Sequence, residues 1–230
     1  IVPHIKIEGV NKNLNSNTKL LYHFDGDDGT STFTEETGRV VSVTGSPTNE
    51  TDYKAVGKGC LQITTGQILS VPDHADFTLT GSDATWDFWI YTKAMEAGTL
   101  GWIYHQYNNN NDFFGIMYYR SGANYSIYGM LYITGFVDGF DVNDNLNEWV
   151  HVTITKEGQV FKFYKNGELK KTQNSPGDLS NYSSPVYLNY GIGSDGTFSN
   201  KLNALVDEFV FTKGVAIPPN GKGYKDLGIN

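Results

Sequence analysis

Cysteine, charge and long apolar runs are all scarce in this 230-residue chain. The single cysteine, Cys60, excludes an intrachain disulfide framework and a cysteine-based zinc site. No run approaches the roughly 18 apolar residues that a membrane-spanning helix needs. Charged residues make up 18% of the chain, too few for a disordered polyelectrolyte. Helix-period stretches are nearly absent, and no repeat of 20–50 residues points to a solenoid or a propeller.

Positively charged residues are fewer than negatively charged ones. Lysine and arginine number 17 against 25 aspartates and glutamates, which gives a net charge of −8. Capture of nucleic acid or of an anionic membrane needs clustered cations, so we expect neither partner and no membrane insertion. The first residue is Ile1 and no signal peptide is recognisable. We therefore expect the chain to be processed, trimmed or a fragment.

Glycine and aromatic side chains are plentiful instead, and this balance favours strands and turns. There are 26 glycines, and aromatics make up 14% of the residues. Short apolar or alternating runs separated by turn residues predict about thirteen strands. They are 18–24, 39–44, 59–64, 67–71, 84–92, 99–107, 112–120, 124–134, 148–156, 159–165, 168–172, 185–192 and 203–212. So many short strands in one chain predict an all-β fold of two packed antiparallel sheets.

The chain divides into a central domain with a short segment at each end. Residues 1–17 start with a brief alternation at Ile5 and Ile7 and then turn Asn-rich, which predicts a small strand or arm followed by a linker; the alternative is a disordered tail. Residues 18–216 form the predicted domain, and 217–230 are a C-terminal tail. Within the domain, Asn166-Gly167 predicts a type I′ hairpin turn.

Alternation along the strands separates an apolar face from an unusual outward face. In 84–92, Trp86, Phe88 and Ile90 share one side, which we expect to be the core side. The outward side of several strands carries aromatic and hydrogen-bonding groups rather than lysine and glutamate. Such a face is typical of a covered or ligand-binding surface.

An ordered set of segments resembles the laminin-G-like branch of the concanavalin A-like lectin/glucanase superfamily. The similarity spans residues 19–215. It rests on LLYHFDG (20–26), GKGCLQI (57–63), LSVPD (69–73), ATWDFWI (84–90), EWVHVT (148–153), FYKNG (163–167) and VDEFVF (206–211). The resemblance implies a jelly-roll sandwich with one concave and one convex antiparallel sheet.

The C-terminal part of the predicted domain resembles one particular group of laminin-G-like domains. Residues 206–209 and 212–216 are similar to the close of laminin-G-like domains in tailed-phage virion proteins. The implied function is a non-enzymatic module on a virion surface, either a capsid decoration or a tail-fibre or spike element, which adheres to host glycans or to other virion proteins. The arm would then support attachment or homo-oligomerisation. The alternative is a carbohydrate-binding module of a secreted bacterial glycan-degrading or cell-surface protein, which would place the chain outside the cell.

Catalytic carboxylates are not apparent. Glucanases of the superfamily carry a Glu-x-Asp-x-x-Glu type pattern on one strand, whereas 84–92 offers only Asp87. The neighbours Asp207 and Glu208 point to opposite faces of a regular strand, so they do not form a pair of acids. We therefore expect no enzyme activity; a glucanase-type hydrolase is the third reading.

A structural calcium ion is implied by the same resemblance. Asp207 corresponds to a late-strand aspartate that holds Ca²⁺ in relatives, and Asp25 and Gly59 lie in segments that would supply carbonyl oxygens. Alternation places Asp207 on the side of Leu205, Phe209 and Phe211, where a carboxylate is expensive to bury alone. The competing interpretation is a carboxylate satisfied by backbone N–H groups or a lysine. The acidic cluster Asp138, Asp141 and Asp144 is expected to be a solvated loop.

Sugar binding is the remaining hypothesis for the outward aromatics. Aromatic faces contact sugar C–H surfaces, and planar polar groups bind the hydroxyls. The candidate residues on the concave sheet are Trp89, Tyr91, Tyr128, Tyr132, Trp149 and His151. Residues 108–111, with Tyr104 and Tyr107, would form a rim. The competing interpretation is that these aromatics pack under loops or against a neighbouring subunit.

Overall fold

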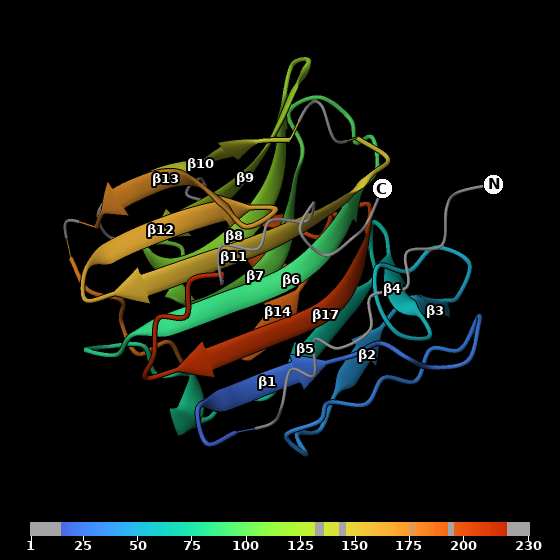
Figure 1. Ribbon diagram of the computed structural model, residues 1–230, viewed down its shortest axis with the longest axis horizontal. Helices are drawn as coiled ribbons and strands as arrows, with labels where there is room; N and C mark the ends of the chain where they lie inside the picture. Colours follow the sequence, from blue (N-terminus) through green and yellow to red (C-terminus); the bar gives the residue numbers. More distant parts are fainter. Residues whose placement is uncertain (1–14, 132–135, 143–145, 176, 193–195, 220–230) are drawn as a thin grey trace.

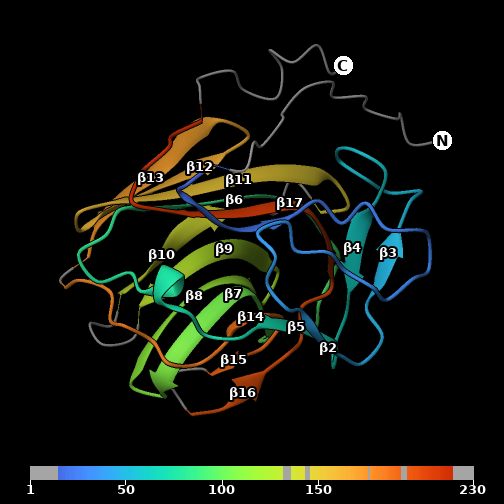
Figure 2. The same cartoon turned by 90° about the horizontal axis from the view of Figure 1, so that it is seen from below.

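Two antiparallel sheets packed face to face make up the molecule (Figures 1 and 2). The structure is a computed structural model that describes residues 15–131, 136–142, 146–175, 177–192 and 196–219. Seven strands of sheet A follow one another in the order β13 (Glu168–Asn174), β12 (Val160–Lys165), β11 (Trp149–Glu157), β6 (Ala84–Thr92), β17 (Ala204–Lys213), β4 (Cys60–Ile63) and β3 (Thr48–Glu50). The eighth strand, β1 (Thr18–Tyr22), lies off this path and pairs with β17. Sheet B has the order β10 (Phe136–Asp141), β9 (Asn124–Leu131), β8 (Asp112–Ser121), β7 (Leu100–Asn109), β14 (Val186–Leu188), β5 (Ile68–Val71), β2 (Ser42–Thr44).

A small two-stranded ribbon accompanies the sandwich. β15 (Gly191–Ile192) pairs with β16 (Phe198–Ser199), and Figure 2 shows both on the side of sheet B that faces away from sheet A. A single 3-10 turn, η1 (Ala75–Phe77), is the only helix among the described residues. The predicted all-β sandwich of two antiparallel sheets is confirmed. No helix in the described part of the chain is long and apolar enough to cross a membrane.

The predicted strands correspond to observed ones, with one division and three omissions. The range 185–192 separates into β14 and β15 because Asn189, at φ 62°, breaks the extended backbone between them. The strands β3, β10 and β16 were not predicted, since they are short or interrupted by glycine and acidic residues. Asn166 and Gly167 both have positive φ, 51° and 80°, as the predicted type I′ turn requires.

Aromatic side chains fill the space between the sheets. Trp86 is fully buried, and its ring lies 5.0 Å from Phe114, 5.4 Å from Phe211 and 5.7 Å from Tyr104. The other inward residues of β6, Phe88 and Ile90, are also buried, as alternation predicts. The four rings come from four different strands, two in each sheet, so this cluster joins the two layers.

A bulge in β17 corrects the predicted side for Asp207. The register with β6 shifts between Asp207 and Val210, and Glu208 has a φ of 52°. The extra residue turns Phe209 and Phe211 into the core, whereas Asp207 stays on the outer side of sheet A. The prediction that Asp207 shares a side with Phe209 and Phe211 is therefore wrong, because strict alternation does not hold across a bulge.

Several predictions fall outside the described residues. These are residues 1–14 of the arm, 220–230 of the tail, Tyr132 of the sugar-binding set and Asp144 of the acidic cluster. Asp138 and Asp141 of the same cluster lie on strand β10, so the predicted loop is wrong there, although Asp141 is exposed as predicted.

Candidate functional site

An aromatic and polar surface, called the aromatic face below, lies on the outer side of sheet A. It consists of Tyr91 and Asp87 on β6 with Trp149 and His151 on β11, and Thr153 of β11 is buried beneath it. Antiparallel pairing sets Trp149 opposite Tyr91, and Thr153 opposite Asp87. The Tyr91 and Trp149 ring centroids are 5.7 Å apart in an edge-on arrangement. Period-2 alternation thus brings rings and polar groups from two strands onto one surface.

The polar part of the aromatic face is a chain of hydrogen bonds centred on a carboxylate. His151 Nε2 lies 3.1 Å from Asp87 Oδ1, and Thr153 Oγ1 donates to Asp87 Oδ2 over 2.6 Å. The side chains of Asp87 and His151 are each 20% exposed. Both groups are therefore partly accessible beside the neighbouring rings.

The structure divides the predicted sugar-binding set between two opposite surfaces. Tyr91, Trp149 and His151 lie on the aromatic face. Trp89 belongs to the same side, with its ring centroid 4.8 Å from that of His151, but it is only 6% exposed and supports the surface from beneath. Tyr128 lies on β9 in sheet B, packed against the Trp102 cluster on the outer side of that sheet. The expectation that these residues line one sheet is wrong, because the sequence does not reveal which strands are neighbours.

The two tyrosines of the predicted rim, Tyr104 and Tyr107, also lie in different environments. Tyr104 is fully buried among the core aromatics, so it lines no surface. Tyr107 is half-buried on the outer side of sheet B, 6.2 Å from Tyr187 between ring centroids. The Tyr190 ring centroid lies 4.9 Å from that of Tyr187, and the Phe198 ring centroid lies 5.1 Å from that of Tyr190, so both rings extend this group. Sequence reasoning missed this tyrosine group; the YLNY run at 187–190 was its one local signal.

Asp207 occupies a buried cradle where β17 meets the end of β1 and the start of β4. Pairing of Tyr22 with Phe209, and of Leu61 with Val206, brings both segments alongside it. Asp207 Oδ2 accepts hydrogen bonds from Ala55 N at 3.0 Å and Val56 N at 2.9 Å. Its Oδ1 is buried and has no hydrogen-bond partner in the described part of the chain. Burial, reinforced by the charge of Glu208, raises the pKa of this carboxyl well above its ordinary value.

Backbone oxygens gather in the same region. A Cβ placed on Gly59 would lie 3.0 Å from Phe24 O, 3.3 Å from Glu50 O and 3.5 Å from Gly26 O. Phe24 has a φ of 59°, an unusual conformation for a bulky residue, in the segment that presents its carbonyl. The Asp25 side chain accepts from the backbone N–H groups of Lys58 and Gly59, so it positions the 57–59 segment.

This donor set fits a hard cation. Ca²⁺ prefers carboxylate and carbonyl oxygens, and this part of the fold contains both the buried Asp207 carboxylate and the carbonyls around Gly59. No group of three or more His, Cys, Asp or Glu side chains suited to a metal occurs in the described ranges, so a metal here would depend on backbone carbonyls. Of the predicted residues, Asp207 would be the ligand, Asp25 a positioning group, and Gly59 the position whose missing side chain leaves space.

Two other titratable groups are held in their neutral forms. Burial raises the pKa of the Cys60 thiol, which donates to the carbonyl of Tyr53. Burial also lowers the pKa of His105 to about 3, and its ring lies 4.3 Å from that of Trp102 beneath β15. Neither group is suited to acid-base or nucleophilic chemistry at neutral pH. The prediction that Cys60 is a buried core residue is confirmed.

Comparison with known proteins places the chain among laminin-G-type sandwiches. A family model described as the Concanavalin A-like lectin/glucanases superfamily matches residues 64–216. No curated protein sequence matches the chain at a significant level. Among solved structures, domain 4 of an extracellular arabinanase from Geobacillus stearothermophilus, in complex with arabinotriose, is 15% identical, with a TM-score of 0.64 over 93% of this chain and 100% of that domain.

Receptor-binding domains of botulinum neurotoxins share the fold. The domain of the C/D mosaic serotype is 14% identical, with a TM-score of 0.63 over 94% of this chain and 52% of that chain. The serotype D domain solved with N-acetylneuraminic acid is 12% identical, with a TM-score of 0.61 over 92% and 51% respectively. The chain thus spans about half the length of the toxin domains that it resembles.

Proposed function

We propose that this chain, which belongs to the Concanavalin A-like lectin/glucanases superfamily, is a non-enzymatic module that binds glycans through its aromatic face. The observation that carries the proposal is the juxtaposition on this face of the Tyr91 and Trp149 rings with the Asp87, His151 and Thr153 chain. Rings of this kind stack on sugar C–H surfaces, and carboxylate, imidazole and hydroxyl groups bind sugar hydroxyls. Two similar structures were solved with saccharides, which supports the same class of ligand.

The charge of the molecule favours a neutral glycan. The net charge is −8, and Asp87 is the carboxylate at the centre of the polar chain. A polyanionic saccharide would be repelled by both, whereas a neutral chain of sugar rings meets no such barrier. Affinity from one shallow face would be modest and would rise with the number of copies displayed together.

The carboxylates of sheet A support a role without catalysis. Hydrolysis of a glycosidic bond needs two carboxyl groups free to act as acid and as base or nucleophile. Asp87 is engaged by His151 and Thr153, and Asp207 is buried and bonded to Ala55 and Val56. Asp87 is thus held as a hydrogen-bond acceptor at the proposed sugar site and Asp207 is buried, so neither is placed to act as an acid or a nucleophile.

A glycan array followed by titration calorimetry tests the proposal. We expect Trp149→Ala to weaken binding of the best neutral glycan about tenfold or more, equivalent to roughly 1.4 kcal/mol, because a stacking platform is removed. Tyr187→Ala removes a comparable ring from the opposite side of the sandwich and serves as the matched control. Loss of binding in the Tyr187 variant but not in the Trp149 variant would assign the site to sheet B, and an array with no binding would contradict the function.

The wider setting that we propose is a virion surface, as a capsid decoration or tail-fibre or spike element. Its support is the similarity of residues 206–209 and 212–216 to the end of laminin-G-like domains in tailed-phage virion proteins. The N-terminal arm would attach the module to a neighbour, with Ile5 and Ile7 adding a strand to a sheet edge. Deletion of residues 1–17 should then abolish particle association while glycan binding stays intact. Unchanged association would remove the arm from the proposal.

The calcium site is a further part of the proposal. The unpartnered Asp207 Oδ1 and the carbonyl cradle around Gly59 support it. A bound Ca²⁺ would neutralise the buried carboxylate and fasten the ends of β1 and β4 to β17.

A further inference from the structure

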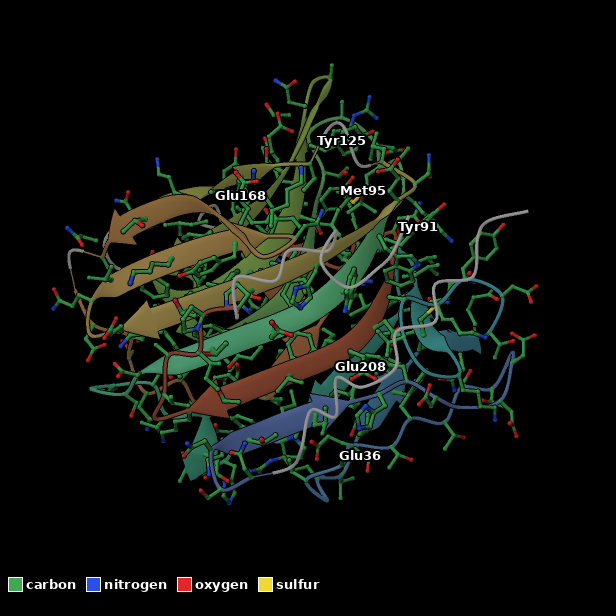
Figure 3. The ribbon with its side chains drawn as sticks, in the orientation of Figure 1. Glu36, Tyr91, Met95, Tyr125, Glu168 and Glu208 are labelled. Carbon is green, nitrogen blue, oxygen red and sulfur yellow. The ribbon has the colours of Figure 1, made fainter. Side chains whose placement is uncertain are left out.

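A cavity of about 260 Å³ opens between the chain that follows β1 and the segment 32–36. Its walls include His23, Phe24 and Asp25 on one side, with Phe33, Glu36 and Asn49 on the other. None of these residues belongs to the aromatic face, so the cavity does not depend on the proposed glycan site. Figure 3 labels Glu208 on β17 and Glu36 beyond β1, both toward this border of sheet A.

Asn49 supplies the most specific feature of the cavity. The residue is 1% exposed, and its Nδ2 donates to Thr30 Oγ1 at 2.9 Å and to Thr32 O at 3.0 Å. These two bonds fix the orientation of the amide. Its Oδ1 is buried and has no hydrogen-bond partner among the described residues. A buried acceptor left unpaired is costly, so a ligand that donates a hydrogen bond here would recover that free energy.

The remaining polar walls are also rich in acceptors. The acidic residues Asp25 and Glu36 are both in the lining and both exposed. His23 Nδ1 is engaged with Glu208 Oε1 at 2.9 Å, which adds a third acidic group behind the wall. Among the described residues of the lining there is no lysine or arginine. An anionic ligand would be repelled, and a cation with several N–H donors would be attracted.

Aromatic rings complete the site. The Phe24 and Phe33 rings meet edge to face with centroids 6.0 Å apart. A ring face attracts an ammonium group that is partly removed from water. The volume lies below that of the pockets that hold drug-sized ligands, so the ligand must be small.

From these features we propose that this cavity binds a small organic cation through a primary ammonium group. The ammonium would donate to Asn49 Oδ1 and the Glu36 carboxylate, and would lie near the Phe24 and Phe33 rings. Amino sugars and short polyamines both carry this group. The proposal goes beyond the glycan function, since neutral sugars lack the charge that the site selects.

Calorimetry of the full chain in buffer with EDTA tests the site. Glucosamine and 1,4-diaminobutane are the probes, and N-acetylglucosamine is the matched sugar without the charge. We expect at least one amine to bind about tenfold or more tighter than N-acetylglucosamine, and the amine that binds identifies the source. Equal binding of the acetylated sugar, or no binding of either amine at millimolar concentration, would overturn the proposal.

Two variants locate the binding. Asn49 makes structural bonds, so the exposed Glu36 is the safer position, and Glu36→Gln should weaken amine binding about threefold or more by removing a charge. Glu168→Gln, on the distant edge strand β13, should leave it unchanged. Amine affinity that is equal in both variants would contradict this location. Trp149→Ala should not alter amine binding, which separates failure here from failure of the glycan proposal.

Discussion

Calcium is expected to raise the thermal unfolding midpoint of this protein by roughly 5–10 °C at pH 8. At about 100 times its dissociation constant, a ligand of the folded state alone adds about 2.7 kcal/mol, and 1 kcal/mol corresponds to about 2–4 °C for a domain of this size. The physical source is Asp207, whose buried Oδ1 has no partner among the described residues. Differential scanning fluorimetry with EDTA or with added Ca²⁺ gives the measurement.

The calcium effect should also depend on pH. Burial raises the pKa of Asp207 in the folded state above its unfolded value. The protonated form therefore favours folding at low pH, and this contribution is lost as the pH rises through the folded pKa. Ca²⁺ binds the ionised carboxylate, so the gain from calcium should grow as the pH increases toward 8. A gain that is the same at pH 5 and pH 8 would argue against Asp207 as the ligand.

Asp207→Asn should have opposite effects on stability in the metal-free and the calcium-bound protein. Without metal at pH 8 we expect the variant to be more stable than the parent by about 1–3 kcal/mol, because no buried charge remains. With calcium the order should reverse, since the variant loses the metal. Asp27→Asn changes an 82% exposed acid of the neighbouring turn and serves as the control, with the calcium response retained. A calcium response that survives in the Asp207 variant would place the ion elsewhere.

Trp86→Ala should lower the free energy of unfolding by about 3–5 kcal/mol, the range for truncating a buried aromatic residue. Trp86 is fully buried and contacts rings from both sheets, so its removal leaves a cavity where the layers meet. Urea unfolding followed by circular dichroism measures the change, with the m-value checked for two-state behaviour.

Two further tryptophan variants make the core prediction specific. Trp86→Phe keeps one ring in the same space and should cost less than half as much. Trp149→Ala truncates a half-buried ring on the aromatic face and should cost about 1 kcal/mol or less. A Trp86→Ala cost similar to that of Trp149→Ala would show that the core cluster does not join the sheets as described. The Trp149 measurement also verifies that the glycan-binding variant is folded.

Alternation and turn chemistry determined the strands and most of their faces. β6 illustrates this, since Trp86, Phe88 and Ile90 are buried and Tyr91 lies outside. Asn166-Gly167 likewise has the positive φ values that its turn type requires. These properties are local: a residue's face depends on its parity along one strand, and a tight turn depends on two residues.

The tertiary structure alone decided which surfaces these strands assemble. Tyr91 and Tyr128 look equivalent by parity, yet they lie in different sheets. The bulge at Glu208 separates Asp207 from Phe209, and Asn49 becomes a cavity residue only because residues 23–26 and 32–36 lie beside it in the fold. Strand order, bulges and cavities depend on contacts between residues far apart in the chain. The sequence by itself therefore determined the class of fold and the chemistry of each strand, while long-range packing decided which of those groups share a site.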